Sequence, residues 1–197
     1  MQQKFIRDDF EKFHDYGCLI PDRIIYFGSE WDDGEEEGGV DSQSAKFLIK
    51  NLIYLDRLEK APITIYWNSP GGCWFRGMAI YDVILGLRSK VNMIGFGMVR
   101  SMGTIIMQAC YERLLAPNCD FLIHEGIDGY YGIPKDFRSW AKYSEYSSNK
   151  MYDIYLDKIR EKHPKYKKET IKELCTTDCI LIGEEAIKLG LADKVLK

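Results

Sequence analysis

The fold is decided by residues 42–67, which read SQSAKFLIKNLIYLDRLEKAPITIYW. Apolar side chains in residues 42–58 recur three and four positions apart, which places them on one face of a helix. They are Ala45, Leu48, Ile49, Leu52 and Leu55. Pro62 ends this pattern, and the β-branched and aromatic residues 63–67 then predict a strand.

The same alternation continues on both sides of this stretch. Residues 23–27 predict an earlier strand. A helix at residues 77–87, a strand at residues 91–96, a helix that begins near Ser101 and a strand at residues 121–123 are predicted to follow. Alternating strands and helices predict an α/β fold with parallel strands.

Residues 140–162 have a different character. They are rich in Tyr, Lys and Glu, with aromatic residues at wide spacing. This pattern predicts a long, partly exposed helix that projects from the body and is suited to an oligomer contact.

Length and composition set the broad class. The 197 residues suit a single domain with a substantial core. With 46% hydrophobic residues, 29% charged residues and a formal net charge of -3, the chain has no electrostatic footprint for nucleic acid. It has neither a leader-like start nor an apolar run long enough to cross a membrane, so we expect a cytoplasmic protein.

Cysteines and acidic residues suggest no further chemistry. Cys175 and Cys179 are spaced like two residues on one helical face but lack the doubled Cys-x-x-Cys pattern of a zinc site. We expect these thiols to pack as small apolar groups, and we expect no bound metal or cofactor. Residues 32–39, which read DDGEEEGG, predict a solvated mobile loop.

The first candidate functional feature is the turn at residues 68–72, which read NSPGG and follow a predicted strand. Proline fixes one torsion, and paired glycines permit backbone conformations that other residues avoid. Such a turn can aim an amide N–H into a cavity, although on its own it is typical of an ordinary turn.

The second feature is Ser101, where a strand gives way to the apolar residues 104–107. Free N–H groups at the first turn of a helix suit a developing oxyanion. The commoner use of serine at this place is an N-cap, and both interpretations stay open at this point. Val99 stands where a Gly-x-Ser-x-Gly elbow has its first glycine, which disfavours an α/β-hydrolase.

The third feature is His124, which closes the predicted strand 121–123. Of the three histidines, His14 lies in a polar stretch and His163 lies in a lysine-rich one. A lone histidine at a strand end is more often structural than catalytic. A role as a general base therefore depends on a partner serine and an acid.

A series of segments resembles, in the same order, segments of the Clp protease proteolytic subunit. The segments are residues 68–72 (NSPGG), 77–82 (GMAIYD), 101–103 (SMG), 116–118 (APN), 122–124 (LIH), 183–186 (GEEA) and 190–195 (GLADKV). One motif arises by chance, whereas this many in order do not. The resemblance spans residues 23–196.

The resemblance implies a crotonase-like α/β spiral with a projecting handle helix, and a serine endopeptidase. It makes Ser101 the nucleophile, His124 the general base and Asp178 the acid that orients the histidine. The backbone N–H groups of Gly72 and Met102 resemble the oxyanion hole. Hydrolysis would then proceed through an acyl-enzyme.

Assembly and partners are implied in the same way. The resemblance implies a homo-oligomer of heptameric rings, stacked as a tetradecamer that encloses the active sites. It implies peptide or unfolded-protein substrates delivered by an AAA+ ATPase unfoldase. The net charge and the lack of a long apolar run predict no nucleic acid and no membrane as partner.

Three departures from the family pattern stand out. Thr177 lies where the family usually has an arginine that pairs across the ring interface, and residues 32–39 look inserted. Residues 1–22 do not resemble the pore-gating loop, so we expect a divergent N-terminal segment there and the peptidase domain at residues 23–197. Such divergence suits a phage-encoded or otherwise specialised member.

Two other functions remain as alternatives. An acyl-CoA enzyme of the same fold would need paired glutamates or equivalent acid-base groups near the oxyanion hole. A catalytically idle ring subunit or scaffold would not need a complete Ser, His and Asp set, and the presence of that set favours peptide hydrolysis.

Overall fold

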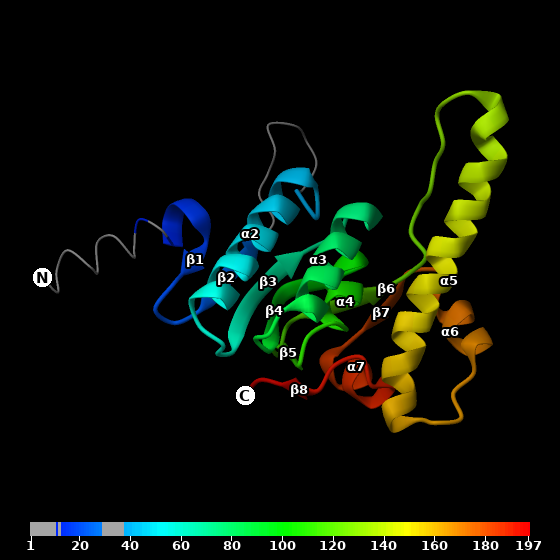
Figure 1. Ribbon diagram of the computed structural model, residues 1–197. Helices are drawn as coiled ribbons and strands as arrows, with labels where there is room; N and C mark the ends of the chain where they lie inside the picture. The colour runs from blue at the N-terminus through cyan, green and yellow to red at the C-terminus, as the bar shows by residue number, and fades with distance from the viewer. Residues whose placement is uncertain (1–10, 12, 29–37) are drawn as a thin grey trace, which may run out of the picture.

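The computed structural model describes residue 11, residues 13–28 and residues 38–197 (Figure 1). Most of the tract predicted to be a mobile loop, residues 32–37, lies outside the described residues, as do residues 1–10 and 12 of the predicted N-terminal segment.

The described strands form an eight-stranded sheet. They are β1 (Cys18–Leu19), β2 (Ile24–Gly28), β3 (Ile63–Ser69), β4 (Val91–Arg100), β5 (Glu112–Leu115), β6 (Asp120–Ile123), β7 (Cys179–Leu181) and β8 (Lys194–Val195). The helices are α2 (Ser42–Leu58), α3 (Trp74–Gly86), α4 (Met102–Met107), α5 (Phe137–Lys162), α6 (Lys168–Cys175) and α7 (Gly183–Leu189), with a 3-10 turn η1 (Pro134–Asp136).

Parallel pairing dominates the sheet. Strands β2, β3, β4, β5 and β8 pair in that order, all in parallel, while β1 and β7 pair antiparallel at its margins. The predicted α/β class with parallel strands is confirmed.

Helix α2 forms where the sequence predicted it and has the same bounds, residues 42–58. The Asp41 carboxylate accepts hydrogen bonds from the N–H groups of Gln43 and Ser44, which caps the first turn. Its predicted apolar face is buried at Ala45, Leu48, Leu52 and Leu55.

Strand β4 changes neighbours halfway along its length. Residues 92–95 pair with β5, whereas residues 98–100 pair with β6. Between them Gly97 has a φ of +60°, which favours glycine, and the Met98 N–H donates to Asn68 Oδ1 at 3.2 Å. The end of β4 therefore leaves β5 and runs beside β6.

Trp67 of β3 sets how closely α4 approaches the sheet. Its ring is fully buried and stacks on Phe27 with ring centroids 4.2 Å apart. A Cβ on Gly103 would lie only 2.8 Å from Trp67 Nε1. Glycine at position 103 thus lets the start of α4 rest on the tryptophan.

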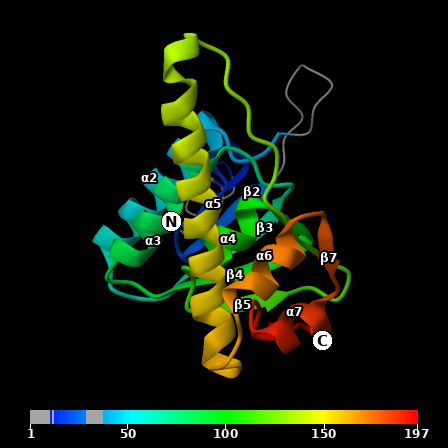
Figure 2. The ribbon, with the colours of Figure 1, turned by 90° about the vertical axis from the view of Figure 1, so that its right-hand side faces the viewer.

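Helix α5 projects from the body, as predicted, and begins at Phe137 rather than at Trp140 (Figures 1 and 2). Its later half is buried at Met151, Tyr152, Ile154, Tyr155, Leu156 and Ile159. The part that extends beyond the other helices carries exposed aromatic side chains. Within the described residues, no helix is both long and apolar enough for a bilayer crossing.

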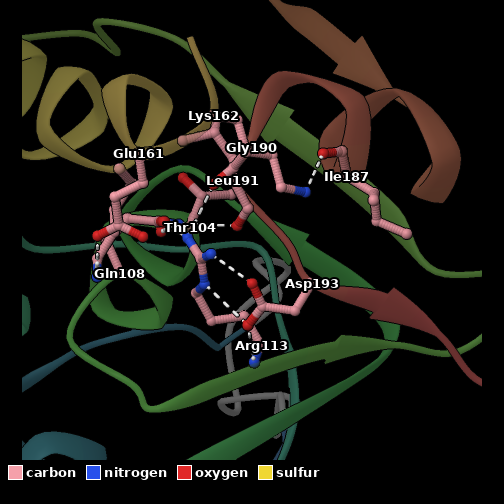
Figure 3. Close-up of polar contacts among 10 residues, drawn as sticks. Thr104, Gln108, Arg113, Glu161, Lys162, Ile187, Gly190, Leu191 and Asp193 are labelled. Atoms are coloured by element: carbon pink, nitrogen blue, oxygen red, sulfur yellow. Dashed lines mark hydrogen bonds and ion pairs between the residues drawn. The ribbon is translucent and has the colours of Figure 1, made fainter. Parts of the chain in front are cut away.

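Arg113 of β5 fastens the C-terminal segment to the sheet (Figure 3). Only 5% of this residue is exposed, and its guanidinium forms an ion pair with Asp193. Its Nη1 donates to Gln108 Oε1 at 2.8 Å and to the Gly190 carbonyl at 2.9 Å. Gln108 in turn donates to the Thr104 carbonyl at 2.7 Å, so the network continues into α4.

Candidate functional site

Two parallel strands bring Ser101 and His124 to the same edge of the sheet. Ser101 follows the last residue of β4 and His124 follows the last residue of β6. The Ser101 N–H donates to the Leu122 carbonyl at 2.8 Å. Arg100 and Asp120 form an ion pair that links the same two strands. Crevices at the carboxyl ends of parallel strands are common binding sites.

The antiparallel pairing of β6 with β7 brings Asp178 to His124. Ile123 pairs with Cys179, so the residues one step beyond them face each other. His124 Nδ1 and Asp178 Oδ1 lie 2.8 Å apart. When this nitrogen donates to the carboxylate, Nε2 retains a lone pair and can accept a proton. The Asp178 side chain is 66% exposed, against 25% for that of His124.

Ser101 has a strained backbone. Its φ of 49° and ψ of -118° lie in a region that non-glycine residues rarely adopt, at a cost of about 1–3 kcal/mol. Its side chain makes no capping hydrogen bond, so the hydroxyl is not used as an N-cap acceptor. The residue occupies a sharp strand-to-helix turn, which is the placement of nucleophiles in elbow motifs, although Val99 breaks that motif.

The glycine turn packs directly against this strained residue. A Cβ on Gly71 would lie 2.6 Å from Ser101 Cβ and 3.0 Å from the Met102 nitrogen. Gly72 has a φ of +138°, and a Cβ there would lie 2.7 Å from the nitrogen and from the oxygen of Val40. Glycine is therefore required at position 71 for the turn to reach the start of α4, and at position 72 for the turn to pack against the Val40 backbone.

A cavity of about 600 Å³ joins these groups. Ser101, His124, Gly72 and Met102 line it, whereas Asp178 is not among the described lining residues and lies behind the histidine. Met102 begins α4, so its N–H has no acceptor within the helix. Four of the five residues predicted for the site thus share one cavity, and the fifth contacts it through His124.

Aromatic residues form one wall of the cavity, a feature that the sequence did not reveal. Trp74, Phe75, Trp140 and Tyr143 line this wall. The Phe75 and Tyr143 rings stack with centroids 5.4 Å apart, and Trp140 meets Tyr143 edge-on at 6.1 Å. The aromatic spacing in α5 predicted a projecting helix, but the contribution of α3 depends on tertiary packing.

The charged residues of the cavity are acidic. Glu125 and Asp128 line it, and the described lining includes no lysine or arginine. An aromatic wall with acidic groups nearby can accommodate an extended peptide with large apolar side chains. Within the part of the chain that the structure describes, His, Cys, Asp and Glu side chains form no cluster of three that could hold a metal ion.

The cysteines near Asp178 behave as apolar groups. Burial raises the pKa of the Cys175 thiol to about 12 and also raises the pKa of Cys179. Both thiols are free of disulfide bonds. The predicted packing role of Cys175 agrees with its complete burial.

Comparison with known proteins identifies the family. A sequence model described as Clp protease matches residues 8–197. The chain is also 32% identical over 184 residues to a protein of Deinococcus radiodurans named ATP-dependent Clp protease proteolytic subunit, covering 92% of this chain and 83% of that protein. The chain therefore belongs to the Clp protease family, and its fold is the crotonase-like α/β spiral of that family.

Proposed function

We propose that the chain is a serine endopeptidase in which Ser101 is the nucleophile, His124 the general base and Asp178 the acid that orients the imidazole. His124 Nε2 takes the proton of Ser101 Oγ as the oxygen attacks the scissile carbonyl. The N–H groups of Gly72 and Met102 stabilise the oxyanion. His124 then protonates the leaving amine, and water releases the acyl group from Ser101.

One observation carries this proposal: the strained Ser101 lines the same cavity as a histidine that is hydrogen-bonded to a carboxylate. The hydrogen bonds of the described residues do not include one between Ser101 Oγ and His124. Catalytic contacts of this kind are often long in substrate-free sites and shorten in the substrate complex. The proton transfer is therefore assigned to the substrate-bound site.

The composition of the cavity supports peptide hydrolysis over acyl-CoA chemistry. That alternative requires paired glutamates or equivalent acid-base groups. Glu125 is the one glutamate among the described lining residues, and the one histidine there, His124, is bonded to Asp178. Its backbone N–H donates to the Cys175 carbonyl at 2.8 Å, which ties the end of β6 to the end of α6.

The proposal extends to assembly. Heptameric rings stack as a tetradecamer through the handle helix α5, and an AAA+ ATPase delivers unfolded protein to the enclosed sites. Two observations support it: the projecting, aromatic-rich half of α5, and the word "ATP-dependent" in the name of the Deinococcus radiodurans relative.

The test compares Ser101→Ala with Ser148→Ala, a control serine that lines the same cavity. Ser101→Ala should lose both peptide hydrolysis and labelling by a fluorophosphonate, while Ser148→Ala should retain both. Mass spectrometry of the labelled chain should locate the adduct on Ser101. Labelling that persists in Ser101→Ala, or a chain that neither labels nor hydrolyses peptides, would overturn the proposal.

A further inference from the structure

The carbonyl of Ser101 is held by two hydrogen bonds from one residue. The Thr104 N–H donates to it at 3.0 Å, and Thr104 Oγ1 donates to it at 2.6 Å. Both bonds restrain the peptide group that follows Ser101. The orientation of this group sets the unusual ψ of Ser101, which is -118°. The opposite side of the residue is held by its N–H bond to Leu122 at 2.8 Å.

The threonine hydroxyl is itself held by a residue distant in the sequence. The Tyr155 hydroxyl lies 2.6 Å from Thr104 Oγ1, and both residues are completely buried. Because Thr104 Oγ1 donates to the Ser101 carbonyl, Tyr155 is the donor in this second bond. Burial raises the pKa of Tyr155 well above its ordinary value, so the phenol keeps the proton it donates.

Helix α5 is therefore connected to the candidate nucleophile by two consecutive hydrogen bonds. Tyr155 lies in the buried half of α5, Thr104 lies on α4, and Ser101 precedes α4. A threonine hydroxyl bonded to a carbonyl three residues earlier is a common local arrangement. The contact with Tyr155 is what fixes the rotamer of that hydroxyl, since a buried donor and acceptor without partners would be costly.

We propose that Thr104 and Tyr155 are positioning residues for the nucleophile, an inference that rests on the proposed peptidase function. They hold the Ser101 carbonyl so that the strained φ and ψ persist and Oγ points into the cavity. Strained torsions are retained only where surrounding contacts over-determine them. Neither side chain is among the described residues that line the cavity, so neither is expected to contact substrate.

The experiment compares the unchanged chain with Thr104→Val, Thr104→Ser, Tyr155→Phe and the control Tyr152→Phe. Tyr152 is also buried on α5, but the centroid of its ring lies 5.5 Å from Lys172 Nζ, and the hydrogen bond to Thr104 Oγ1 comes from Tyr155. Turnover of a fluorogenic peptide gives kcat and KM. The rate of phosphonate labelling reports the orientation and reactivity of Ser101 Oγ without a full catalytic cycle.

Thr104→Val should lower kcat by about tenfold to a hundredfold, the size expected for a misaligned nucleophile, with KM nearly unchanged. Tyr155→Phe should cause a smaller loss of the same kind, and phosphonate labelling should slow in parallel in both variants. The fractional loss should be the same at every pH tested, because neither substituted side chain takes part in the proton transfer. Thr104→Ser keeps the hydroxyl, so its kcat should be close to that of the unchanged chain. Tyr152→Phe should also have the kcat of the unchanged chain.

A second measurement does not depend on activity. Hydrogen–deuterium exchange of residues 101–107 should be faster in Thr104→Val and Tyr155→Phe than in Thr104→Ser and Tyr152→Phe. Equal kcat and equal exchange in all the variants would overturn the positioning role, as would a loss confined to KM. If the unchanged chain did not hydrolyse peptides, the proposed function would fall, while the exchange measurement would still decide the role of Thr104 and Tyr155.

Discussion

At the level of single residues, Ser101 and His124 are held in different ways. The backbone conformation holds Ser101, whereas a side-chain contact with Asp178 holds the His124 ring. Asp178 meets the imidazole through one carboxylate oxygen at 2.8 Å, and the remainder of its side chain is largely exposed. Substitutions at Asp178 should therefore affect the orientation and tautomer of His124 with little effect on folding.

Asp178→Asn should lower kcat by roughly four orders of magnitude, because an amide favours the wrong histidine tautomer. Asp178→Ala and His124→Ala should each cause comparable losses that do not add when combined, since the three residues act as one unit. Steady-state kinetics of the single and double variants measures this. A near-normal rate in Asp178→Ala would assign the orienting role to another carboxylate.

Gly103→Ala should destabilise the fold, because its Cβ would lie 2.8 Å from the buried Trp67 Nε1. Overpacking of this kind costs about 1–3 kcal/mol. The matched control is Gly86→Ala at the end of α3, where a Cβ would meet nothing within 4 Å. Urea unfolding should show a lower midpoint for Gly103→Ala alone. Equal midpoints would mean that the tryptophan moves aside freely.

Family resemblance indicated which residues to place in the candidate site, but not the geometry in which the structure holds them. Residues 101–103 and 122–124 indicated a nucleophile and a base through family resemblance. The backbone strain at Ser101 was not predicted, because the Gly-x-Ser-x-Gly motif that signals such strain requires a glycine at position 99, where this chain has valine. The contact between Thr104 and Tyr155 was also missed, since it joins residues 51 positions apart and leaves no local pattern.

Among secondary-structure elements, long local patterns were predicted well and short strands were not. Helix α2 was predicted with its bounds because its apolar face and its proline-marked end are local signals. Strands β5, β7 and β8 have only two to four residues each and depend on partners far away in the chain. Their formation reflects tertiary pairing, which single-sequence patterns do not encode.

The ion pair between β5 and the C-terminal segment should make stability depend on pH. Partial burial alone would raise the pKa of Asp193, but hydrogen bonds and charge from Arg113 outweigh it and lower the pKa below its usual value. A carboxylate with a lowered folded-state pKa stabilises the fold above its unfolded pKa of about 3.9 and loses this effect as pH falls toward the folded value.

Asp193→Asn should therefore reduce the free energy of unfolding at pH 7 by about 1 kcal/mol, because the buried guanidinium loses a charged partner whose 36% exposed side chain is partly screened by solvent. The difference from the unchanged chain should shrink as the pH falls below about 4. Urea titrations at several pH values measure this, with Asp136→Asn on the 3-10 turn as a control. A difference that stays constant with pH would exclude the ion pair as its cause.

The exposed half of α5 should mediate contact between rings. Phe137 and Tyr146 are both exposed there, and burying such side chains favours association. Replacing both by serine should leave single rings or smaller species in sedimentation velocity, whereas Tyr111→Ser, an exposed tyrosine next to β5, should not. A double variant that still sediments as the stacked barrel would contradict this role.

At the scale of the whole molecule, the chamber that we propose for the stacked rings should limit what is digested. Unfolding a stable domain requires roughly 5–15 kcal/mol, and the sequence contains no Gly-x-x-x-x-Gly-Lys-Ser/Thr loop for coupling ATP to that work. Without nucleotide, a short fluorogenic peptide and an unfolded casein-like chain should be cleaved, while a folded reporter should survive. Rapid loss of the folded reporter would show that the active sites are open to solvent.

Because β6 pairs with β7, the candidate site depends more on the number of residues in β7 than on which side chains β7 carries. His124 meets Asp178 because Ile123 pairs with Cys179, and a slip of one residue would turn every side chain of β7 to the opposite face. A substitution at an exposed position such as Ile180 should therefore leave this contact in place. An insertion between Asp178 and Cys179 would move the carboxylate out of register with His124 in a single step.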